Sequence, residues 1–276
     1  MVNAKIIGSG TSIPIQRITS QDLFQEAQSE LRFDIPNTYL ERILGIKERR
    51  WADSSVKPSR LAAQASEEAM KDAGITPDQI DRVIFCGIER DSAEPSTAHT
   101  VQALIGANKS LAPCFDISNA CHGFVDGMLA ADAFIKTGSA ETVLICTGET
   151  SSKCCRAMLR KIATQPKMCS RDFKSMLGFF SLGDAGAAVI MQRTEDPAGF
   201  KYVNSRADGS YARYCHYEYD DAGLFSGEMC MTEVSGFFLS LIATLLKRPI
   251  HILIGDQRML ITFYAIKWER GHIKVY

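Results

Sequence analysis

Short runs of β-branched and apolar residues recur along the first two thirds of the chain, and each run is bounded by Gly, Asp, Pro or Ser. A continuous apolar run of this length is typical of a strand that is buried on both faces of a sheet. We therefore predict five strands, at Lys5–Gly8, Arg82–Ile88, Ala112–Ser118, Glu141–Thr147 and Ala185–Met191.

Helical periodicity fills the segments between these runs. Small and apolar residues recur along one stripe of Ser59–Ala73, and Gly74 ends that pattern. Two further helices are predicted at Thr97–Ile105 and at Cys121–Lys136, the second ended by Gly138. Because strands and helices alternate, the pattern predicts an α/β layered architecture with a largely parallel central sheet.

The pattern changes at the polar turn Gln192–Pro197, after the fifth predicted strand. Residues 198–228 are rich in aromatic and polar side chains and only weakly periodic, and Thr232–Leu246 is again predicted as a helix. We accordingly divide the chain into residues 1–193 and 194–276.

The composition is that of an ordinary globular protein. The chain has 276 residues, enough for one or two domains, of which 46% are hydrophobic and 23% charged. The 31 Lys and Arg residues are balanced by 32 Asp and Glu residues, with no long run of like charge. This balance argues against a nucleic-acid partner and against a basic membrane-binding patch, and it favours a small-molecule or protein substrate.

The N-terminus lacks the basic start, apolar stretch and small-residue cleavage site of a secretory signal, so we expect a cytoplasmic protein. The longest apolar run, Gly236–Leu246, is about half of the roughly 20 residues that a membrane span needs. We therefore predict no transmembrane segment.

The cysteine usage also excludes several classes of site. The chain has nine cysteines, an odd number, and no Cys-x-x-Cys motif, which argues against a zinc site and against a secreted disulfide framework. Most of the nine are expected to be small core residues. The neighbouring pair Cys154 and Cys155 is expected to be two packed thiols, because adjacent residues form a strained disulfide.

Cys121 differs from the other cysteines in its position. A strand is predicted to end near Ser118 and a helix to begin near Cys121, and the unpaired N–H groups of a helix N-terminus favour a thiolate. The small neighbours Ala120 and Gly123 would let a substrate and backbone donors approach the sulfur closely. This setting suits a nucleophile, and the alternative is one more buried core cysteine.

Three segments, in the same order along the chain, resemble one enzyme family. Ser118-Asn-Ala-Cys-His-Gly-Phe124 resembles the active-site cysteine segment of the ketoacyl-acyl-carrier-protein synthase III enzymes, members of the thiolase-like condensing superfamily. Tyr39–Trp51, with Gly-Ile-Lys-Glu-Arg-Arg, resembles a second family segment, and Ser181–Val189, with Gly-Asp-Ala-Gly-Ala-Ala, resembles a third. The resemblance covers residues 4–193 well and is weak beyond them.

The resemblance implies a thiolase-like layered α/β fold, with residues 1–193 as a complete N-terminal half and residues 194–276 as an incomplete C-terminal half. It implies that Cys121 takes an acyl group from a CoA thioester. A carbanion from malonyl-acyl-carrier protein or from a second acyl-CoA then attacks this group in a Claisen condensation, with backbone donors near Gly123 stabilising the oxyanion. We also expect a homodimer, and the resemblance implies no metal or redox cofactor.

A fourth segment resembles one particular group of condensing enzymes. Glu94-Pro-Ser-Thr-Ala98 resembles a stretch of the olefin-biosynthesis acyl-CoA condensing enzymes, whose glutamate reaches across the dimer into the partner's site. Glu94 is thus a candidate base that deprotonates a second acyl-CoA. The alternative is a solvated loop carboxylate before a proline.

The C-terminal half departs from the family pattern. The family carries a catalytic His in a His-Gln-Ala-Asn-like segment and a catalytic Asn in a Gly-Asn-Thr-Ser-like segment, and this chain has neither segment after Leu246. His251 and His272 are the histidines of this region, and Asn204 is the only Asn after position 119. We keep His251 as a candidate catalytic residue. The rival hypothesis is a truncated, catalytically impaired paralogue that acts as a non-catalytic partner subunit.

The CoA-binding clamp of the family is also altered. Tyr39 occupies the position where many members have Trp, and Ile43 occupies the position of their Arg. Tyr39 keeps an aromatic face for the adenine ring, and Arg42 or Trp51 is a candidate to supply the missing contact.

Overall fold

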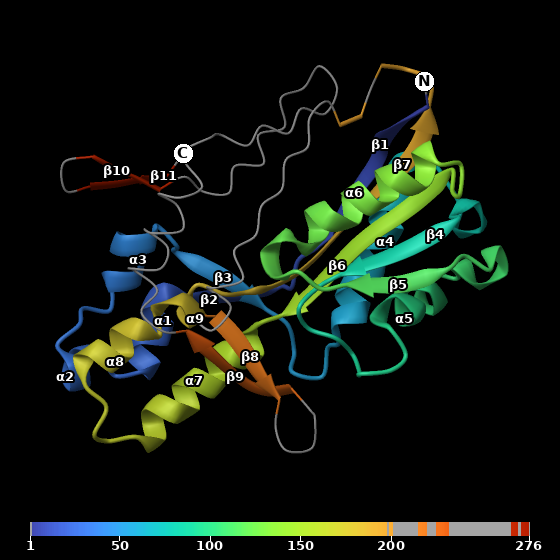
Figure 1. Cartoon of the computed structure of the whole chain (residues 1–276). Helices are drawn as coiled ribbons and strands as arrows, with labels where there is room; N and C mark the ends of the chain where they lie inside the picture. The colour runs from blue at the N-terminus through green and yellow to red at the C-terminus, as the bar shows by residue number, and fades with distance from the viewer. Residues whose placement is uncertain are drawn as a thin grey trace.

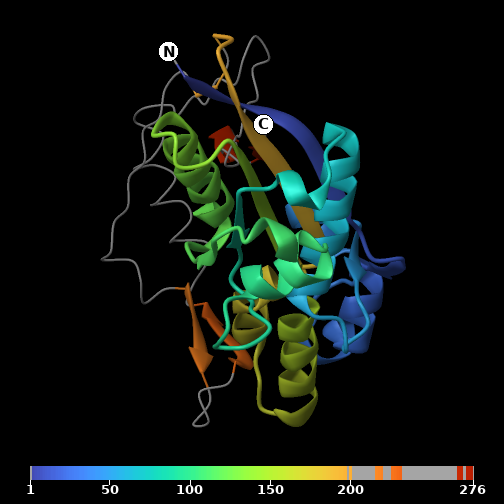
Figure 2. The same ribbon diagram turned by 90° about the vertical axis from the view of Figure 1, so that its right-hand side faces the viewer.

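The structure is a computed structural model that describes residues 2–197, 199–200, 215–219, 225–231, 266–269 and 272–275. Its centre is a five-stranded sheet with helices on both faces (Figure 1). A second group of helices lies beyond one end of the sheet, as Figure 2 also shows.

The strands lie across the sheet in the order β1, β7, β6, β4, β5. All five predicted strands are confirmed, as β1 (Asn3–Ser12), β4 (Arg82–Cys86), β5 (Cys114–Ile117), β6 (Thr142–Thr150) and β7 (Asp184–Thr194). β4 pairs in parallel with β5 and with β6, whereas β7 pairs antiparallel with β6 and with β1. Four strands therefore run in one direction and β7 runs in the other.

The prediction of a largely parallel sheet holds for the pairings of β4 and is wrong for those of β7. Thr150 at the end of β6 pairs with Asp184 at the start of β7. The chain therefore leaves the sheet after β6 and re-enters it as β7 at the same end, so β7 runs antiparallel to β6. The helices after β4 and β5 instead carry the chain to the opposite end, as a parallel crossover requires.

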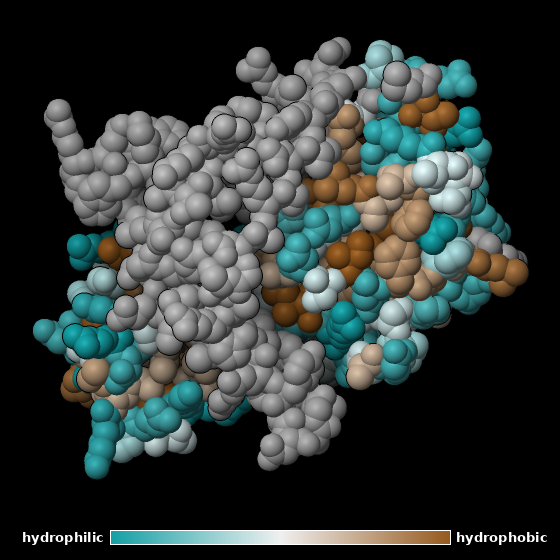
Figure 3. Space-filling model, viewed as in Figure 1, coloured by the Kyte–Doolittle hydropathy of each residue, from teal (hydrophilic) through white to brown (hydrophobic). Residues whose placement is uncertain are grey.

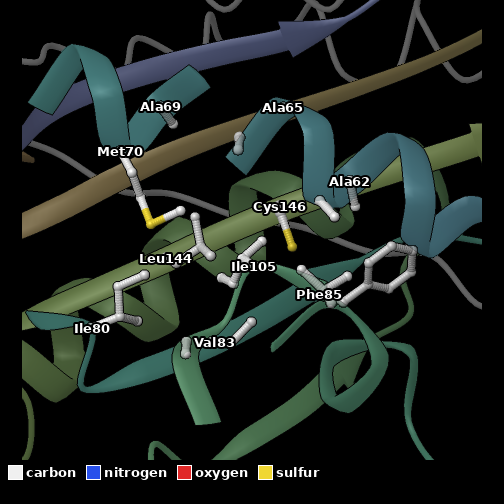
Figure 4. Packing of buried hydrophobic residues seen from close by; sticks show 14 of the residues in the cluster. Ala62, Ala65, Ala69, Met70, Ile80, Val83, Phe85, Ile105, Leu144 and Cys146 are labelled. Carbon is white, nitrogen blue, oxygen red and sulfur yellow. The ribbon is translucent and has the colours of Figure 1, made fainter. Parts of the chain in front are cut away.

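Three helices cover the two faces of the sheet, namely α4 (Pro58–Ala73), α5 (Thr97–Leu104) and α6 (Gly123–Lys136). α4 and α5 pack on one face, and α6 packs on the other. Along β4, Val83 and Phe85 join the core under α4 (Figure 4), whereas Ile84 and Cys86 join the core under α6. Both faces of β4 are thus buried, as the continuous apolar run predicts.

Two glycines of β1 let α4 lie close to the sheet. A Cβ atom at Gly8 would lie 2.4 Å from the carbonyl oxygen of Ala69, and one at Gly10 would lie 2.2 Å from that of Ala65. Both distances are shorter than atomic contacts allow, so only glycine fits at these positions. The Gly-Ser-Gly sequence at residues 8–10 therefore serves helix packing.

The elements outside the sheet form a second hydrophobic core. They are α1 (Ser20–Glu26), α2 (Ser29–Phe33), α3 (Tyr39–Leu44), α7 (Ser152–Thr164), α8 (Ser170–Ser175), α9 (Leu177–Phe180) and the paired strands β2 (Gln16–Thr19) and β3 (Glu48–Trp51). The Phe173 ring stacks on that of Phe33 with 4.6 Å between centroids and meets that of Phe24 edge-on at 5.3 Å. Most of these helices are too short to display helical periodicity, so the sequence pattern does not predict them.

The described residues after 200 form two strand pairs, β8 (Cys215–Tyr219) with β9 (Phe225–Met231) and β10 (Ile266–Glu269) with β11 (His272–Val275). β9 lies beside α7 (Figure 1). The predicted helix at Thr232–Leu246 lies outside the described residues. No described helix combines the length and the apolar character that a membrane crossing needs.

Candidate active site

Cys121 lies in a tight turn between β5 and α6. β5 ends at Ile117, a single 3₁₀ turn (η3) covers Ala120–His122, and α6 begins at Gly123, two residues later than predicted. Ala120 has a φ of 45°, in the left-handed region that residues with a Cβ atom rarely enter. Backbone conformations of this kind gather at functional sites, and Cys121 itself is exposed.

Exposure separates Cys121 from the core cysteines. Four described cysteines are buried and form no disulfide, namely Cys86, Cys146, Cys154 and Cys155. Burial raises the pKa of Cys86 and of Cys155 to about 12, and it also raises the pKa of Cys146. Such thiols are inert as nucleophiles at neutral pH. The prediction that Cys154 and Cys155 are packed thiols is confirmed, and the interpretation of Cys121 as a core cysteine is excluded.

One carboxylate contacts both flanks of the Cys121 turn. Asn119 Nδ2 lies 2.6 Å from Asp126 Oδ2, and His122 Nδ1 lies 3.0 Å from Asp126 Oδ1. Residues four apart on a helix share a face, which brings His122 and Asp126 together at the start of α6. Asp126 is not among the site residues predicted from the sequence, although the spacing of a His and an Asp on a predicted helix is a signal that points to it.

Gly123 is buried at the start of α6, and its N–H group has a partner within the turn. That N–H donates to the carbonyl of Ala120 and closes the 3₁₀ turn. A Cβ atom at Gly123 would lie 3.6 Å from the carbonyl oxygen of Ile117, which is an ordinary contact. Gly123 therefore supports the turn, and its role as an oxyanion donor stays a prediction.

Glu94 lies at the exposed tip of the segment that joins β4 to α5. Two carboxylates hold this segment on the β4 side of the tip. Glu149 of β6 accepts the N–H of Ile88 at 2.8 Å. Asp91 accepts the N–H and the hydroxyl of Ser59, at 3.0 and 2.6 Å, where α4 begins. The tip therefore projects from a base that is fixed to two neighbouring elements.

Asp116 fixes the other side of the Glu94 segment to the strand that leads to Cys121. Asp116 lies on β5, and its carboxylate accepts the N–H groups of Thr97 and Ala98, each at 2.9 Å. These groups belong to the N-terminus of α5, which has no side-chain cap of its own. One buried carboxylate thus ties the position of β5 to that of the residues that follow Glu94.

Two acidic side chains beneath this segment are shifted toward their neutral forms. Burial raises the pKa of Glu149 to about 7, and burial also raises the pKa of Glu89. Glu89 accepts a hydrogen bond from the hydroxyl of Thr150, and its second carboxylate oxygen has no hydrogen-bond partner among the described residues. The charge on Glu149 therefore changes near neutral pH.

The residues predicted to contact CoA do not form an open aromatic clamp. Trp51 is only 4% exposed in the second core, and the guanidinium of Arg156 lies over its ring at 4.4 Å from the centroid. Tyr39 is half-buried against the same core, and Arg42 is exposed in the last turn of α3. A substrate contact with Trp51 would require Arg156 to move, so Tyr39 and Arg42 are better placed for the predicted role.

His251 and Asn204 lie outside the described residues, and His272 is part of β11. The catalytic role of His251 therefore stays a prediction. Within the described part of the chain, no group of three or more His, Cys, Asp or Glu side chains is placed to hold a metal ion.

Comparison with known proteins shows which enzymes the chain resembles. The family model for 3-oxoacyl-[acyl-carrier-protein] synthase III matches residues 115–209, which include the Cys121 turn. The β-ketoacyl-[acyl-carrier-protein] synthase III of Caldanaerobacter subterraneus subsp. tengcongensis is 33% identical over 215 residues, and that of Natranaerobius thermophilus is 34% identical over 213 residues. The chain is similar in sequence to the synthase III enzymes. The alignments cover 78% and 76% of this chain and 58% and 57% of the two relatives, so the chain spans less than two thirds of their length.

Solved structures extend the synthase III comparison to the fold. A Cys-to-Ser variant of Xanthomonas campestris OleA with bound lauric acid and lauroyl-CoA matches with a TM-score of 0.79 and 26% identity, over 89% of this chain and 71% of that chain. The same protein with bound cerulenin matches with a TM-score of 0.79 and 26% identity, over 89% and 70% of the two chains. The synthase III resemblance and the thiolase-like α/β fold are therefore confirmed. The division of the chain at residue 193 stays a prediction.

Proposed function

We propose that this chain is an acyltransferase of the synthase III type in fatty-acid or related lipid biosynthesis. In the first half-reaction the Cys121 sulfur attacks the carbonyl carbon of an acyl thioester, the bond to the CoA sulfur breaks, and the acyl group stays on Cys121. In the second half-reaction a carbanion attacks the carbonyl of this acyl group, a carbon–carbon bond forms, and the Cys121 sulfur leaves. The product is a 3-oxoacyl thioester.

The observation that carries this proposal is the exposed Cys121 on a strained turn between a buried strand and a helix. The turn lies inside the range that the synthase III family model matches. The curated relatives named β-ketoacyl-[acyl-carrier-protein] synthase III support the reaction class, and the OleA variant with bound lauroyl-CoA supports an acyl-CoA as the acyl donor.

The carbanion has two candidate sources. Malonyl-acyl-carrier protein supplies one by losing CO₂, and a second acyl-CoA supplies one when a base removes a proton beside its carbonyl. Glu94 is the candidate base for the second source, since it lies exposed at the tip of a segment held on both sides. Glu94→Gln separates the two routes, because the decarboxylative route survives the change and the deprotonating route does not.

We further propose a cytoplasmic homodimer that uses acyl-CoA and acyl-carrier-protein thioesters without a metal or redox cofactor. β5 lies at one edge of the five-stranded sheet, and its apolar residues Phe115 and Ile117 are only partly buried. Figure 3 shows hydrophobic patches on the face that carries α6. A strand edge with apolar neighbours favours association with a second copy of the chain.

Acylation of Cys121 tests the proposal. The purified chain is incubated with a panel of acyl-CoAs of different chain lengths, and its peptides are analysed by mass spectrometry. We expect the Cys121 peptide to gain the mass of the acyl group. Cys121→Ala removes the adduct, whereas Cys169→Ala, at another exposed cysteine, keeps it. A folded chain that is acylated at Cys121 by no member of the panel overturns the proposal.

We expect this chain to complete the first half-reaction faster than the second. Condensation in the family uses a His and an Asn from segments that this sequence does not contain, and loss of one oxyanion donor typically costs about 10²–10³ in rate. Acylation without condensation is also what the rival hypothesis of a non-catalytic partner subunit predicts. Robust 3-oxoacyl product from the purified chain contradicts this expectation and would mean that His251, His272 or Asn204 has been recruited.

A further inference from the structure

The turn that carries Cys121 is closed by hydrogen bonds on two sides. On the backbone side, the N–H of His122 donates to the carbonyl of Asn119 at 3.0 Å. On the side-chain side, the Asn119 amide and the His122 ring both reach Asp126, at 2.6 and 3.0 Å. Each oxygen of the Asp126 carboxylate takes one of these contacts, so the residues before and after Cys121 share one anchor on α6.

The chemistry of the carboxylate fixes the direction of both contacts. An ionised carboxylate only accepts hydrogen bonds, so Asn119 donates through Nδ2 and His122 donates through Nδ1–H. Hydrogen bonds to an ionised group are shorter than neutral ones and about twice as strong. Asp126 therefore sets the orientation of the Asn119 amide and of the His122 imidazole. An asparagine at position 126 offers a single oxygen and satisfies only one of the two donors.

The conformation of Ala120 requires such an anchor. A φ of 45° is unfavourable for a residue with a Cβ atom, so the surrounding contacts must hold it. Asn119 immediately precedes Ala120, and His122 immediately follows Cys121. The Asp126 contacts therefore span both the unfavourable residue and the nucleophile.

We propose that Asp126 is a positioning residue for Cys121, acting through Asn119 and His122. Without its carboxylate the turn relaxes, the Cys121 sulfur samples more orientations, and its reaction with an electrophile slows. The inference deepens the proposed function and rests on it only where the electrophile is an acyl thioester. The reaction of Cys121 with an alkylating agent tests the positioning role separately.

The chain contains its own reference thiols for this test. Cys169 is exposed at the start of α8, and the four buried cysteines named above react only when the chain unfolds. A short pulse of iodoacetamide, followed by peptide mass spectrometry, gives the labelling rate of Cys121 relative to Cys169 in the same molecule. We expect Asp126→Asn to lower this ratio about tenfold, the order of rate change expected from one lost hydrogen bond to a charged group.

Three further variants separate hydrogen bonding from packing. His122→Asn keeps an amide N–H donor close to the position of Nδ1, so we expect it to retain most of the reactivity of Cys121. His122→Phe keeps a ring without a donor, so we expect it to lose as much as Asp126→Asn does. The matched control is Asp132→Asn, which removes another acid–base contact four residues apart on α6, the Asp132–Lys136 pair at 2.7 Å, and leaves the ratio unchanged.

An unchanged ratio in Asp126→Asn overturns the proposal, as does an equal loss in Asp132→Asn. If the buried cysteines of Asp126→Asn also react, that variant has unfolded and the two His122 variants provide the test instead. Equal Cys121-to-Cys169 labelling ratios in His122→Asn and His122→Phe then overturn the proposal. A wild-type chain whose Cys121 alkylates readily but accepts no acyl group disproves the proposed function and leaves the positioning role intact.

Discussion

Replacing Asp116 by asparagine changes one oxygen to an NH₂ group at the point where β5 meets α5. The side chain of Asp116 is 4% exposed, and its carboxylate accepts two backbone N–H groups at 2.9 Å each. The oxygen of an asparagine amide accepts one of these groups, and the NH₂ would face the other donor to donor. The variant therefore leaves a buried N–H without an acceptor at the start of α5.

The cost of Asp116→Asn follows from these contacts. Loss of a hydrogen bond to a charged group costs about 1.5–3 kcal/mol, and loss of a negative charge at a helix N-terminus costs about 0.3–1 kcal/mol. Arg90 lies 3.9 Å from the carboxylate, but its side chain is 40% exposed, so this ion pair contributes little. We expect the free energy of unfolding to fall by about 2–4 kcal/mol.

Urea unfolding followed by far-UV circular dichroism measures this change as a lower midpoint at an unchanged slope. Asp172→Asn is the matched control, because Asp172 also accepts a helix-start N–H, that of Cys169 at 2.9 Å, but is exposed to solvent. We expect a much smaller loss there. A loss below about 1 kcal/mol for Asp116→Asn, the typical cost of an unremarkable substitution, would refute the claim that this carboxylate holds α5 to β5.

Three further predictions concern other residues of the same framework. Burial raises the pKa of Glu149 to about 7, so between its ordinary value of 4.5 and 7 the folded chain holds a proton that the unfolded chain releases. The free energy of unfolding therefore falls as the pH rises through this window. Urea unfolding at several pH values should show that Glu149→Gln removes this fall. The prediction is wrong if the free energy of unfolding depends on pH equally in the two proteins. Gly10→Ala places a Cβ atom 2.2 Å from the carbonyl oxygen of Ala65 and should cost about 1–3 kcal/mol in the same assay, whereas an unchanged midpoint means that α4 can move away. Glu94→Gln should leave Cys121 acylation by acyl-CoA at the wild-type rate, and a slower rate would place Glu94 in the first half-reaction.

The central sheet could be predicted from the sequence because its strands are buried on both faces. β4 shows why, since Val83 and Phe85 face α4 while Ile84 and Cys86 face α6, and all four are apolar. The direction of β7 could not be predicted in this way. It depends on where the chain rejoins the sheet after α9, and no local pattern of polar and apolar residues encodes that position.

The turn that carries Cys121 could be predicted in part from the sequence. The change from strand to helix pattern around Cys121 locates the turn correctly, but the left-handed conformation of Ala120 and the contacts of Asp126 arise only when the turn is formed. The Asp116 carboxylate caps α5, which is not adjacent to Asp116 in the sequence. The residues next to Asp116 therefore give no sign of this contact. The burial of Trp51 beneath Arg156 is likewise a product of tertiary packing.

The proposed function requires Cys121 to accept an acyl group from a thioester. Incubation of the folded chain with lauroyl-CoA, followed by mass spectrometry of the Cys121 peptide, detects this transfer. We predict a lauroyl adduct on Cys121 that neutral hydroxylamine removes, as expected of a thioester, and no comparable adduct on the exposed Cys169. An unmodified Cys121, or equal labelling of Cys121 and Cys169, would show that Cys121 is not the acyl acceptor.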